Sequence, residues 1–431
     1  MPLQVLQPPP PAPRPSLAVS AAPTAASATP DVPAAPVLFA APHRAMFLSG
    51  GIMLLAAFAL WALEIGARAG VVPAPGWVLP PGWMHALLVL GGVFPFFILG
   101  FLFTAMPRWQ GAPDLSLQQW LWPWRLLAAG WVLACVGPWL PGLLVAALVL
   151  VAAGWGACLR VMRGIAYNEH QDALHARTVW WALAGGGLAL LAWLAFALGG
   201  GAVWARIAIG AGVWWFLVPV FFTVCHRMVP FFSSNVIAGY VMVRPRWALR
   251  LVVAASVVHG ALVMAGLGGA AWIADAPAAA VALWLSYKWR PLPALRVPLL
   301  GMLHLGFAWF GIGLALFAVQ GVAGALGQPM LALAPLHALG VGFFGSVLLA
   351  MVSRVTLGHS GRPLVADRLT WGLFIGLELV VLTRVAADLV PSAWSGALML
   401  AAVLGWLTVF GAWAWRYLPA YWRARADGRP G

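Results

Sequence analysis

The run LAPLHALGVGFFGSVLLAMVS, residues 333–353, contains no charged side chain and is long enough to cross a lipid bilayer as one helix. A transmembrane helix needs about 20 consecutive apolar residues, and comparable runs recur along the chain. Of its 431 residues, 63% are hydrophobic and 8% are charged, whereas a soluble domain carries about 25% charged residues. This composition excludes soluble globular, disordered and nucleic-acid-binding proteins. It predicts an all-α, polytopic membrane bundle, because helices satisfy their own backbone hydrogen bonds in lipid.

The apolar runs predict twelve transmembrane helices. Residues 1–42, rich in Pro and Ala, are expected to form a disordered cytoplasmic tail. Residues 43–418 are expected to form the transmembrane domain, and residues 419–431 a basic cytoplasmic tail. The predicted spans are residues 45–66, 84–105, 123–139, 141–159, 178–198, 204–225, 247–268, 270–287, 298–319, 333–353, 370–390 and 393–415.

The basic residues predict the orientation of these spans. With the N-terminus inside, 21 of the 24 basic side chains fall on the inner side, and the outer side keeps Arg68, Arg206 and Arg384. Cytoplasmic loops of membrane proteins carry such an excess of Lys and Arg. The expected location is therefore a bacterial inner membrane, with both termini in the cytoplasm. The three cysteines are scattered and predict neither a disulfide framework nor a thiolate metal site.

Histidines within the spans are the main candidates for chemistry. His85 and His337 are predicted at the same outer depth on different helices, so one haem could be held between their imidazoles. His226 and His304 form an inner pair that could bind copper or a second haem. Each of these four histidines could instead be a packing residue with a hydrogen-bond partner and no ligand role. The same two interpretations apply to His259, which lies alone near the middle of its span. The remaining histidines considered, His43, His170 and His175, are expected to be solvated.

Two segments at the inner side carry further polar residues. In FFTVCHRMVPFFSSNVI, residues 221–237, Pro230 is expected to break the helix just after His226 and Arg227. In MVSRVTLGHSGRPL, residues 351–364, a polar turn with Arg354, His359 and Arg362 is predicted to bind haem propionates or another anion, because arginine binds carboxylates in a bidentate way. The alternative is that these arginines meet lipid headgroups. Near the outer end of the eleventh span, Arg384 and Asp388 are four residues apart and are predicted to pair.

Three of these segments together resemble the NnrS family: residues 337–364, HALGVGFFGSVLLAMVSRVTLGHSGRPL; residues 223–237, TVCHRMVPFFSSNVI; and residues 84–109, MHALLVLGGVFPFFILGFLFTAMPRW. The resemblance implies a bacterial inner-membrane protein of twelve helices that contains haem and copper and protects against nitrosative stress from nitric oxide. The family's Arg-x-x-Pro-Phe-Phe pattern is matched from Arg227 to Phe232, and its second-helix histidine by His85. This second-helix pattern usually continues with a second His and a Glu. Here Leu87 and Leu88 stand in their place, which indicates a divergent branch.

The expected function is therefore that of a haem-binding, and in a second site copper-binding, membrane protein that contributes to tolerance of nitric oxide or of nitrosylated metal species. His85 and His337 would be the axial ligands, His226 and His304 would hold a second metal, and Arg227, Arg354, His359 and Arg362 would bind propionates. A respiratory electron donor is a candidate partner, and catalysis stays open.

Haem-copper oxidase subunits also hold a haem between their second and tenth helices, but the paired histidines of their seventh helix are missing here. Oxidase or proton-pump activity is therefore not predicted. The alternatives are a twelve-helix secondary transporter of a small solute and a metal-free scaffold for assembling respiratory enzymes.

Overall fold

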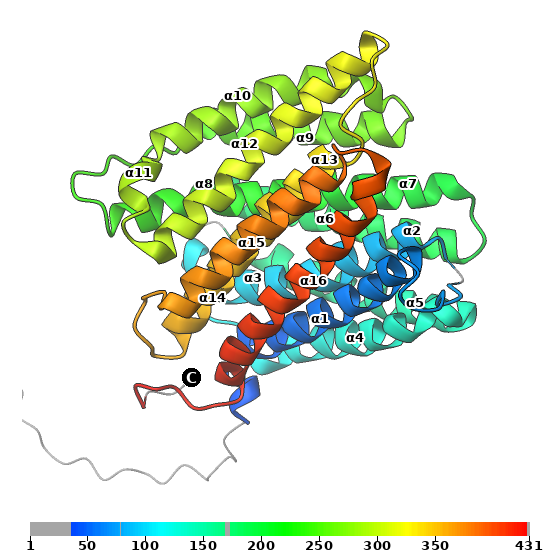
Figure 1. The fold of residues 1–431 in the computed structure, drawn as a ribbon. Coiled ribbons are helices and arrows are strands. Elements are labelled where there is room, and N and C mark those ends of the chain that lie inside the picture. Colours follow the sequence, from blue (N-terminus) through cyan, green and yellow to red (C-terminus); the bar gives the residue numbers. More distant parts are fainter. Residues whose placement is uncertain (1–35, 78, 169–172, 429–431) are drawn as a thin grey trace, which may run out of the picture. The chain divides into compact units, whose positions relative to one another are not determined.

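A computed structural model describes residues 36–77, 79–168 and 173–428 of the chain, and every regular element in these ranges is a helix. Of the predicted N-terminal tail, residues 1–35 lie outside the described residues, and the first long helix begins at Pro42. His170, one of the three histidines expected to be solvated, also lies outside the described residues. The helices are packed side by side as an all-α bundle (Figure 1).

Within the described residues, ten helices are long and apolar enough to cross a membrane. Two predicted spans coincide with helices outside this set, α4 (Leu117–Val136) and α10 (Trp272–Lys288). The 17 residues of α10 extend about 25 Å, which is short of a hydrocarbon core of about 30 Å. The count of twelve spans stays a prediction. The ten are α1 (Pro42–Arg68), α2–η2–α3 (Pro81–Gln110), α5 (Pro141–Ala166), α6 (Ala173–Ala197), α7–η4–α8 (Ala202–Ser234), α9 (Arg246–Met264), α12 (Pro298–Ala325), α13–η6–α14 (Ala334–His359), α15 (Arg368–Ala387) and α16 (Ser392–Tyr417) with its continuation to Tyr421.

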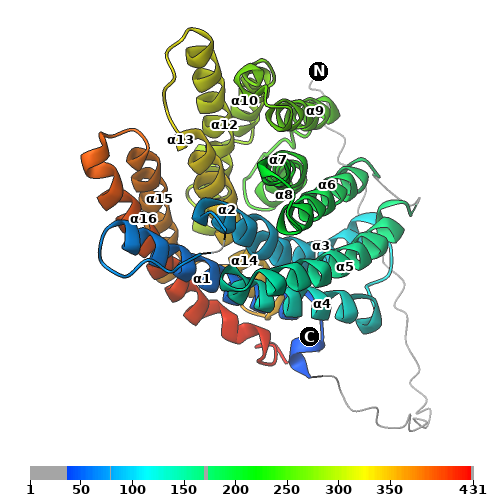
Figure 2. The ribbon, with the colours of Figure 1, turned by 90° about the vertical axis from the view of Figure 1, so that its right-hand side faces the viewer.

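Three of these helices form the centre of the bundle, and each contains a π-helical segment. These segments are η2 (Leu87–Val93), η4 (Ala211–Leu217) and η6 (Ala338–Gly345). The most apolar stretches of the three helices are 72% to 83% buried, against at most 50% for the other seven. Figure 2 shows the three in the middle, with α15 and α16 on one side and α4, α5 and α6 on another. Segments of π-helix are rare and often occur at functional sites.

Proline positions explain where several helices begin but not where they end. Pro42 and Pro298 occupy the first turns of α1 and α12, where a missing N–H costs nothing. The expectation that Pro230 breaks its helix was wrong, because α8 (Val218–Ser234) continues for four residues beyond it. Transmembrane helices tolerate an internal proline when neighbouring groups satisfy the freed carbonyl.

The segment after α14 (Ser346–His359) also differs from the prediction of a polar turn. Arg354 and His359 lie inside this helix, and the turn begins at Ser360. Asp367 then caps α15, accepting hydrogen bonds from the backbone N–H and the hydroxyl of Thr370. Burial raises the pKa of Asp367, but these bonds and the nearby Arg416 guanidinium outweigh it and hold the pKa below its usual value.

Glycine permits close approach of α4 and α5. A Cβ added at Gly130 would lie 2.6 Å from Cγ2 of Val151 and 2.9 Å from the carbonyl oxygen of Ala147. Gly130→Ala is therefore expected to destabilise the protein by about 1–3 kcal/mol, the usual cost of overpacking, measured as a lower thermal unfolding temperature in detergent. Gly156→Ala on α5, where an added Cβ meets nothing within 4 Å, is the matched control and should not lower it. Equal losses in both variants would contradict this packing.

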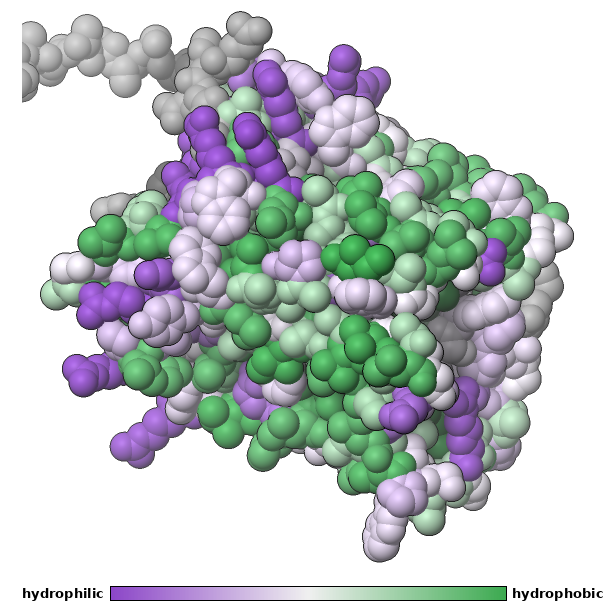
Figure 3. Space-filling model, turned by 90° about the horizontal axis from the view of Figure 1, so that it is seen from above, coloured by the Kyte–Doolittle hydropathy of each residue, from purple (hydrophilic) through white to green (hydrophobic). Residues whose placement is uncertain are grey.

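The surface of the bundle is largely apolar. In the view from above, apolar residues cover the middle of the face and hydrophilic residues gather toward its edges (Figure 3). Large apolar side chains such as Trp181, Trp394 and Leu379 are at least 60% exposed. Such exposure is expected where lipid, not water, is the solvent.

Candidate functional site

A cavity among the central helices contains both His85 and His337. We call it the two-histidine cavity. Its free space, open side included, amounts to about 1130 Å³, and its walls come from α1, α15, α16 and all three central helices. Pockets that bind small molecules are mostly apolar, with a few polar groups. Here most of the lining is aliphatic or aromatic, and the polar lining groups are the two imidazoles, Trp nitrogens and the guanidinium of Arg384.

His337 is held by a carboxylate at the end of α13 (Ala334–His337). Nδ1 of His337 lies 3.0 Å from Oδ2 of Asp388 and 3.0 Å from the carbonyl oxygen of Leu333, and both are acceptors. Nδ1 must therefore carry the proton, which leaves Nε2 with a lone pair. Asp388 in turn lies 2.9 Å from Nη1 of Arg384, so the predicted Arg384–Asp388 pair is confirmed. A histidine with one nitrogen bonded to a carboxylate is the usual arrangement around protein metals.

The charge of Asp388 is maintained by its neighbours. This residue lies one position beyond the end of α15 (Arg368–Ala387). Burial raises the pKa of its carboxyl group, but the hydrogen bond from His337 and the Arg384 guanidinium together hold that pKa below its usual value. An ionised Asp388 accepts and cannot donate, so it fixes the protonated nitrogen of His337.

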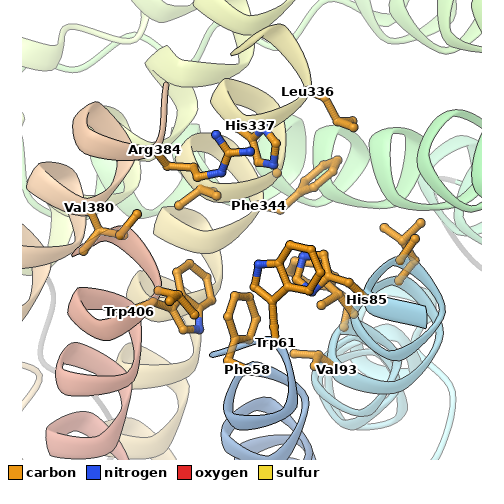
Figure 4. Close-up of a pocket in the computed structure, with 18 of the residues that line it drawn as sticks. Phe58, Trp61, His85, Val93, Leu336, His337, Phe344, Val380, Arg384 and Trp406 are labelled. Atoms are coloured by element: carbon orange, nitrogen blue, oxygen red, sulfur yellow. The ribbon is translucent and has the colours of Figure 1, made fainter. Parts of the chain in front are cut away.

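His85 is positioned by aromatic rings instead of a hydrogen bond. It stacks on Trp61 of α1 with ring centroids 4.3 Å apart, and Phe58 meets it edge-on at 5.6 Å. Its Nδ1 is buried and has no hydrogen-bond partner among the residues that the structure describes. Figure 4 shows His337 beside Arg384 on one side of the cavity and His85 behind the Trp61 ring on another, with Phe344 nearby. A buried ring nitrogen without a partner is costly unless a ligand satisfies it.

One glycine leaves open space in this cavity. A Cβ added at Gly340, one turn after His337, would meet no atom within 4 Å, whereas at Gly342 and Gly345 it would touch Trp309 and Trp406. Gly340 therefore gives room to a ligand, and the other two give room to tryptophans. Leu87 and Leu88, which replace the polar residues of the family pattern, are 1% exposed and pack in the core.

The other histidines in the described ranges have protein partners. His226 lies 3.0 Å from Nε2 of His175 through its Nδ1, and its Nε2 lies 3.2 Å from the carbonyl oxygen of Pro245. His304 of α12 contacts the hydroxyl of Ser233 at 3.0 Å. Ser233 lies on α8, two turns after His226. His226 and His304 thus belong to different hydrogen-bond networks, and neither lines the two-histidine cavity.

Two histidines expected to be solvated are buried. His43 is 4% and His175 2% exposed. The expectation was wrong because α1 and α6 begin at Pro42 and Ala173, earlier than residues 45 and 178, so both side chains fall within helices.

The predicted anion-binding residues lie around a second cavity. Arg227, Arg354 and His359 line it, and Arg362 does not. We call it the arginine cavity. Arg354 follows His337 by 17 residues on one continuous helix, which corresponds to about 25 Å along its axis. One macrocycle cannot contact both His337 and Arg354 at that separation.

Sequence reasoning missed residues that act through tertiary contacts. Asp388 was assigned a partner on its own helix, but its contact with His337 spans 51 positions and has no local signal. Asp275 was not considered, and it binds Nδ1 of the buried His259 at 2.7 Å. The stacking of Trp61 on His85 likewise joins two helices whose relative rotation the sequence leaves open.

These features define a polytopic helical membrane protein whose three central helices enclose a two-histidine cavity. The family model for the NnrS protein matches residues 37–425, and the chain belongs to the NnrS family. No curated protein matches the chain.

Proposed function

We propose that this protein binds haem in the two-histidine cavity, with His85 and His337 as axial ligands, and contributes to tolerance of nitric oxide in a bacterial inner membrane. The observation that carries the proposal is that imidazoles from two central helices line one large apolar cavity. The membership of the NnrS family, whose name points to a response to nitric oxide, supports the biological role.

The residues present fit a haem. The buried Nδ1 of His85 lacks a partner, Nε2 of His337 keeps its lone pair, and Gly340 leaves a gap on the cavity side. Aromatic and aliphatic walls suit the porphyrin, and the Arg384 guanidinium at the cavity wall suits a propionate. When bound, the iron would supply ligand-binding and redox chemistry, and nitric oxide would reach it only by displacing one of the two imidazoles.

The chain's own groups would hold and orient the ligands. Asp388 would keep the proton on Nδ1 of His337 and so direct Nε2 toward the cavity. Trp61 and Phe58 would restrict rotation of the His85 ring and exclude water from it.

We also propose His226 and His304 as ligands of a second metal, provided that their rings give up their present hydrogen bonds. Within the described ranges no group of three or more His, Cys, Asp or Glu side chains is placed to hold a metal ion. Copper binding at either histidine would require the ring to exchange its hydrogen bond to His175 or Ser233 for a metal bond. Propionate binding by Arg227, Arg354, His359 and Arg362 would require a second macrocycle in or beside the arginine cavity.

The visible spectrum of the purified protein, combined with metal analysis, tests the proposal. Protein expressed with haem supplementation is expected to show a Soret band with about one haem per chain bound in this cavity, and the band should shift when nitric oxide is added. Folded protein without such a band would overturn the proposal. In that case, substrate-dependent flux in proteoliposomes would favour a transporter, and co-purification with respiratory enzymes would favour an assembly scaffold.

A further inference from the structure

The arginine cavity concentrates positive charge from distant parts of the chain. Its free space, open side included, amounts to about 1640 Å³. Five arginines line it: Arg108 of α3, Arg227 of α8, Arg244 of the segment before α9, Arg354 of α14 and Arg425 of the C-terminal segment. A helix end that only marks topology would carry basic residues on many separate faces. Here five guanidinium groups converge on one space.

Among the described residues, carboxylates lie near two of the five arginines, Arg108 and Arg425. Asp114 lies 3.6 Å from Arg108, and Asp427 lies 2.6 Å from Arg425. In the part of the chain that the structure describes, no carboxylate contacts Arg244 or Arg354. Unbalanced guanidinium groups around one cavity favour a ligand with several negative charges.

Aromatic rings hold two of the guanidinium groups in place. Arg354 lies over the ring of Phe232 at 4.0 Å, and Arg227 over Trp109 at 4.9 Å. For Arg354, stacking uses the flat face of the guanidinium and leaves its N–H edges to donate hydrogen bonds. Such stacking lowers the entropy lost when a ligand binds.

The C-terminal segment is fixed against the same cavity. Nη1 of Arg425 donates to the carbonyl oxygen of His359 at 3.1 Å, and the N–H of Ala426 donates to that of Ser360 at 2.9 Å. Gly361 has a φ of +70°, which favours glycine, and a Cβ there would lie 2.5 Å from the carboxylate of Asp427 and displace that side chain. These contacts bring Arg425 beside groups more than 60 residues earlier in the chain.

Part of the cavity wall is apolar and reaches the surface. Phe231 and Leu364 line the cavity and are 45% and 48% exposed. The exposed part of the cavity wall therefore includes apolar side chains as well as the Arg108 side chain, which is 62% exposed. Basic pockets between transmembrane helices are known to suit acidic lipid headgroups.

We propose that the arginine cavity binds a ligand carrying two phosphate groups, either the headgroup of a diacidic phospholipid or a soluble diphosphate. Phosphate matches the paired N–H groups of arginine, and two phosphates match the two arginines, Arg244 and Arg354, that contact no carboxylate among the described residues. The apolar opening would accept the acyl chains of a phospholipid. The inference does not depend on haem binding, because this cavity is separate from the two-histidine cavity.

Thermal unfolding of the full-length protein in mild detergent tests this inference. After lipid removal, the protein is titrated with diphosphatidylglycerol, with phosphatidylcholine, and with inorganic pyrophosphate. Diphosphatidylglycerol is expected to raise Tm in a saturable way, whereas phosphatidylcholine is not. A saturable rise with pyrophosphate and none with diphosphatidylglycerol would identify the soluble diphosphate as the source, and rises with both would show that the two phosphates suffice for binding. No saturable rise with either phosphate ligand would overturn the proposal.

A pair of charge variants assigns the effect to this cavity. The double variant Arg244→Gln with Arg354→Gln is expected to weaken binding of the phosphate ligand by at least about tenfold, because each substitution removes charge-assisted hydrogen bonds to phosphate. Arg160→Gln with Arg250→Gln removes the same charge from exposed residues of α5 and α9 outside the cavity. Equal weakening in both would overturn the proposal. If the first double variant does not fold, Arg244→Gln alone, outside any helix, keeps the comparison.

The same variants distinguish phosphate binding from a propionate role. Haem content per chain is measured beside Tm. Unchanged haem content with weakened phosphate binding is expected. A parallel loss of haem in the variant that lacks Arg354 would overturn the phosphate proposal and assign these arginines to a macrocycle. An absent Soret band in the unmodified protein would instead overturn the proposed function and leave the phosphate test intact.

Discussion

His337→Ala is expected to abolish the Soret band of haem-supplemented protein. His337 is the better supported of the two imidazoles, because Asp388 fixes its protonation and orientation through a 3.0 Å hydrogen bond. Removing it deletes one proposed iron ligand, and among the described residues it leaves Arg384 as the side-chain partner of Asp388. Asp388→Asn should keep the imidazole but weaken haem affinity by about 10- to 100-fold, the usual effect of losing the group that orients a ligand. Haem per chain and band position are read from the visible spectrum.

The matched control for His337→Ala is His259→Ala. It removes another buried imidazole that is bound to a carboxylate, at 2.7 Å from Asp275, but one that does not line the cavity. This control is expected to lower Tm and to keep the Soret band. If both variants keep the band, His337 is not an axial ligand. If both lose it, the loss reflects general destabilisation of the membrane bundle.

The helical fold could be predicted from composition because length and apolarity alone select helices in lipid. Each of the twelve predicted spans coincides with a helix, including α4 and α10, which are not among the ten helices apolar and long enough to cross a membrane. Helix starts were less accurate, since Pro42 begins α1 several residues earlier than the apolar run suggests. That error moved His43 from a solvated tail to a buried helix. Depth in a membrane can be read from a sequence, but a few residues at a helix end decide the surroundings of a side chain.

His85 and His337 line one cavity, and their equal depth in the membrane stays a prediction. What depth cannot give is helix rotation and neighbours. His226 and His304 were also assigned similar depths, yet their rings contact His175 and Ser233 and lie in separate networks. The stacking of Trp61 and the hydrogen bond to Asp388 depend on how α1 and α15 pack against the central helices. These contacts distinguish the two pairs, and no sequence pattern encodes them.

Gly340→Leu is expected to produce a folded protein that binds no haem. Gly340 lies one turn after His337 on the same face of the helix, and an added Cβ there meets no atom within 4 Å. The Cβ of a leucine at this position would meet no protein atom, and the rest of its side chain would extend into the two-histidine cavity. It would occupy space beside the His337 ring that a porphyrin needs. Both proposed ligands remain, so loss of the Soret band would report the size of the cavity itself.

Gly372→Leu on α15 is the matched control for that steric test, because an added Cβ also meets nothing within 4 Å but lies outside the cavity. Neither variant should lower Tm, because replacing glycine by leucine inside a helix favours the helix by roughly 0.5–1 kcal/mol. The Gly372 variant should keep its haem and the Gly340 variant should not. A Gly340 variant with full haem content would place the macrocycle elsewhere, even if His337 proved essential. The two substitutions therefore test different parts of the site: one removes a ligand from an open cavity, and the other fills a cavity whose ligands are intact.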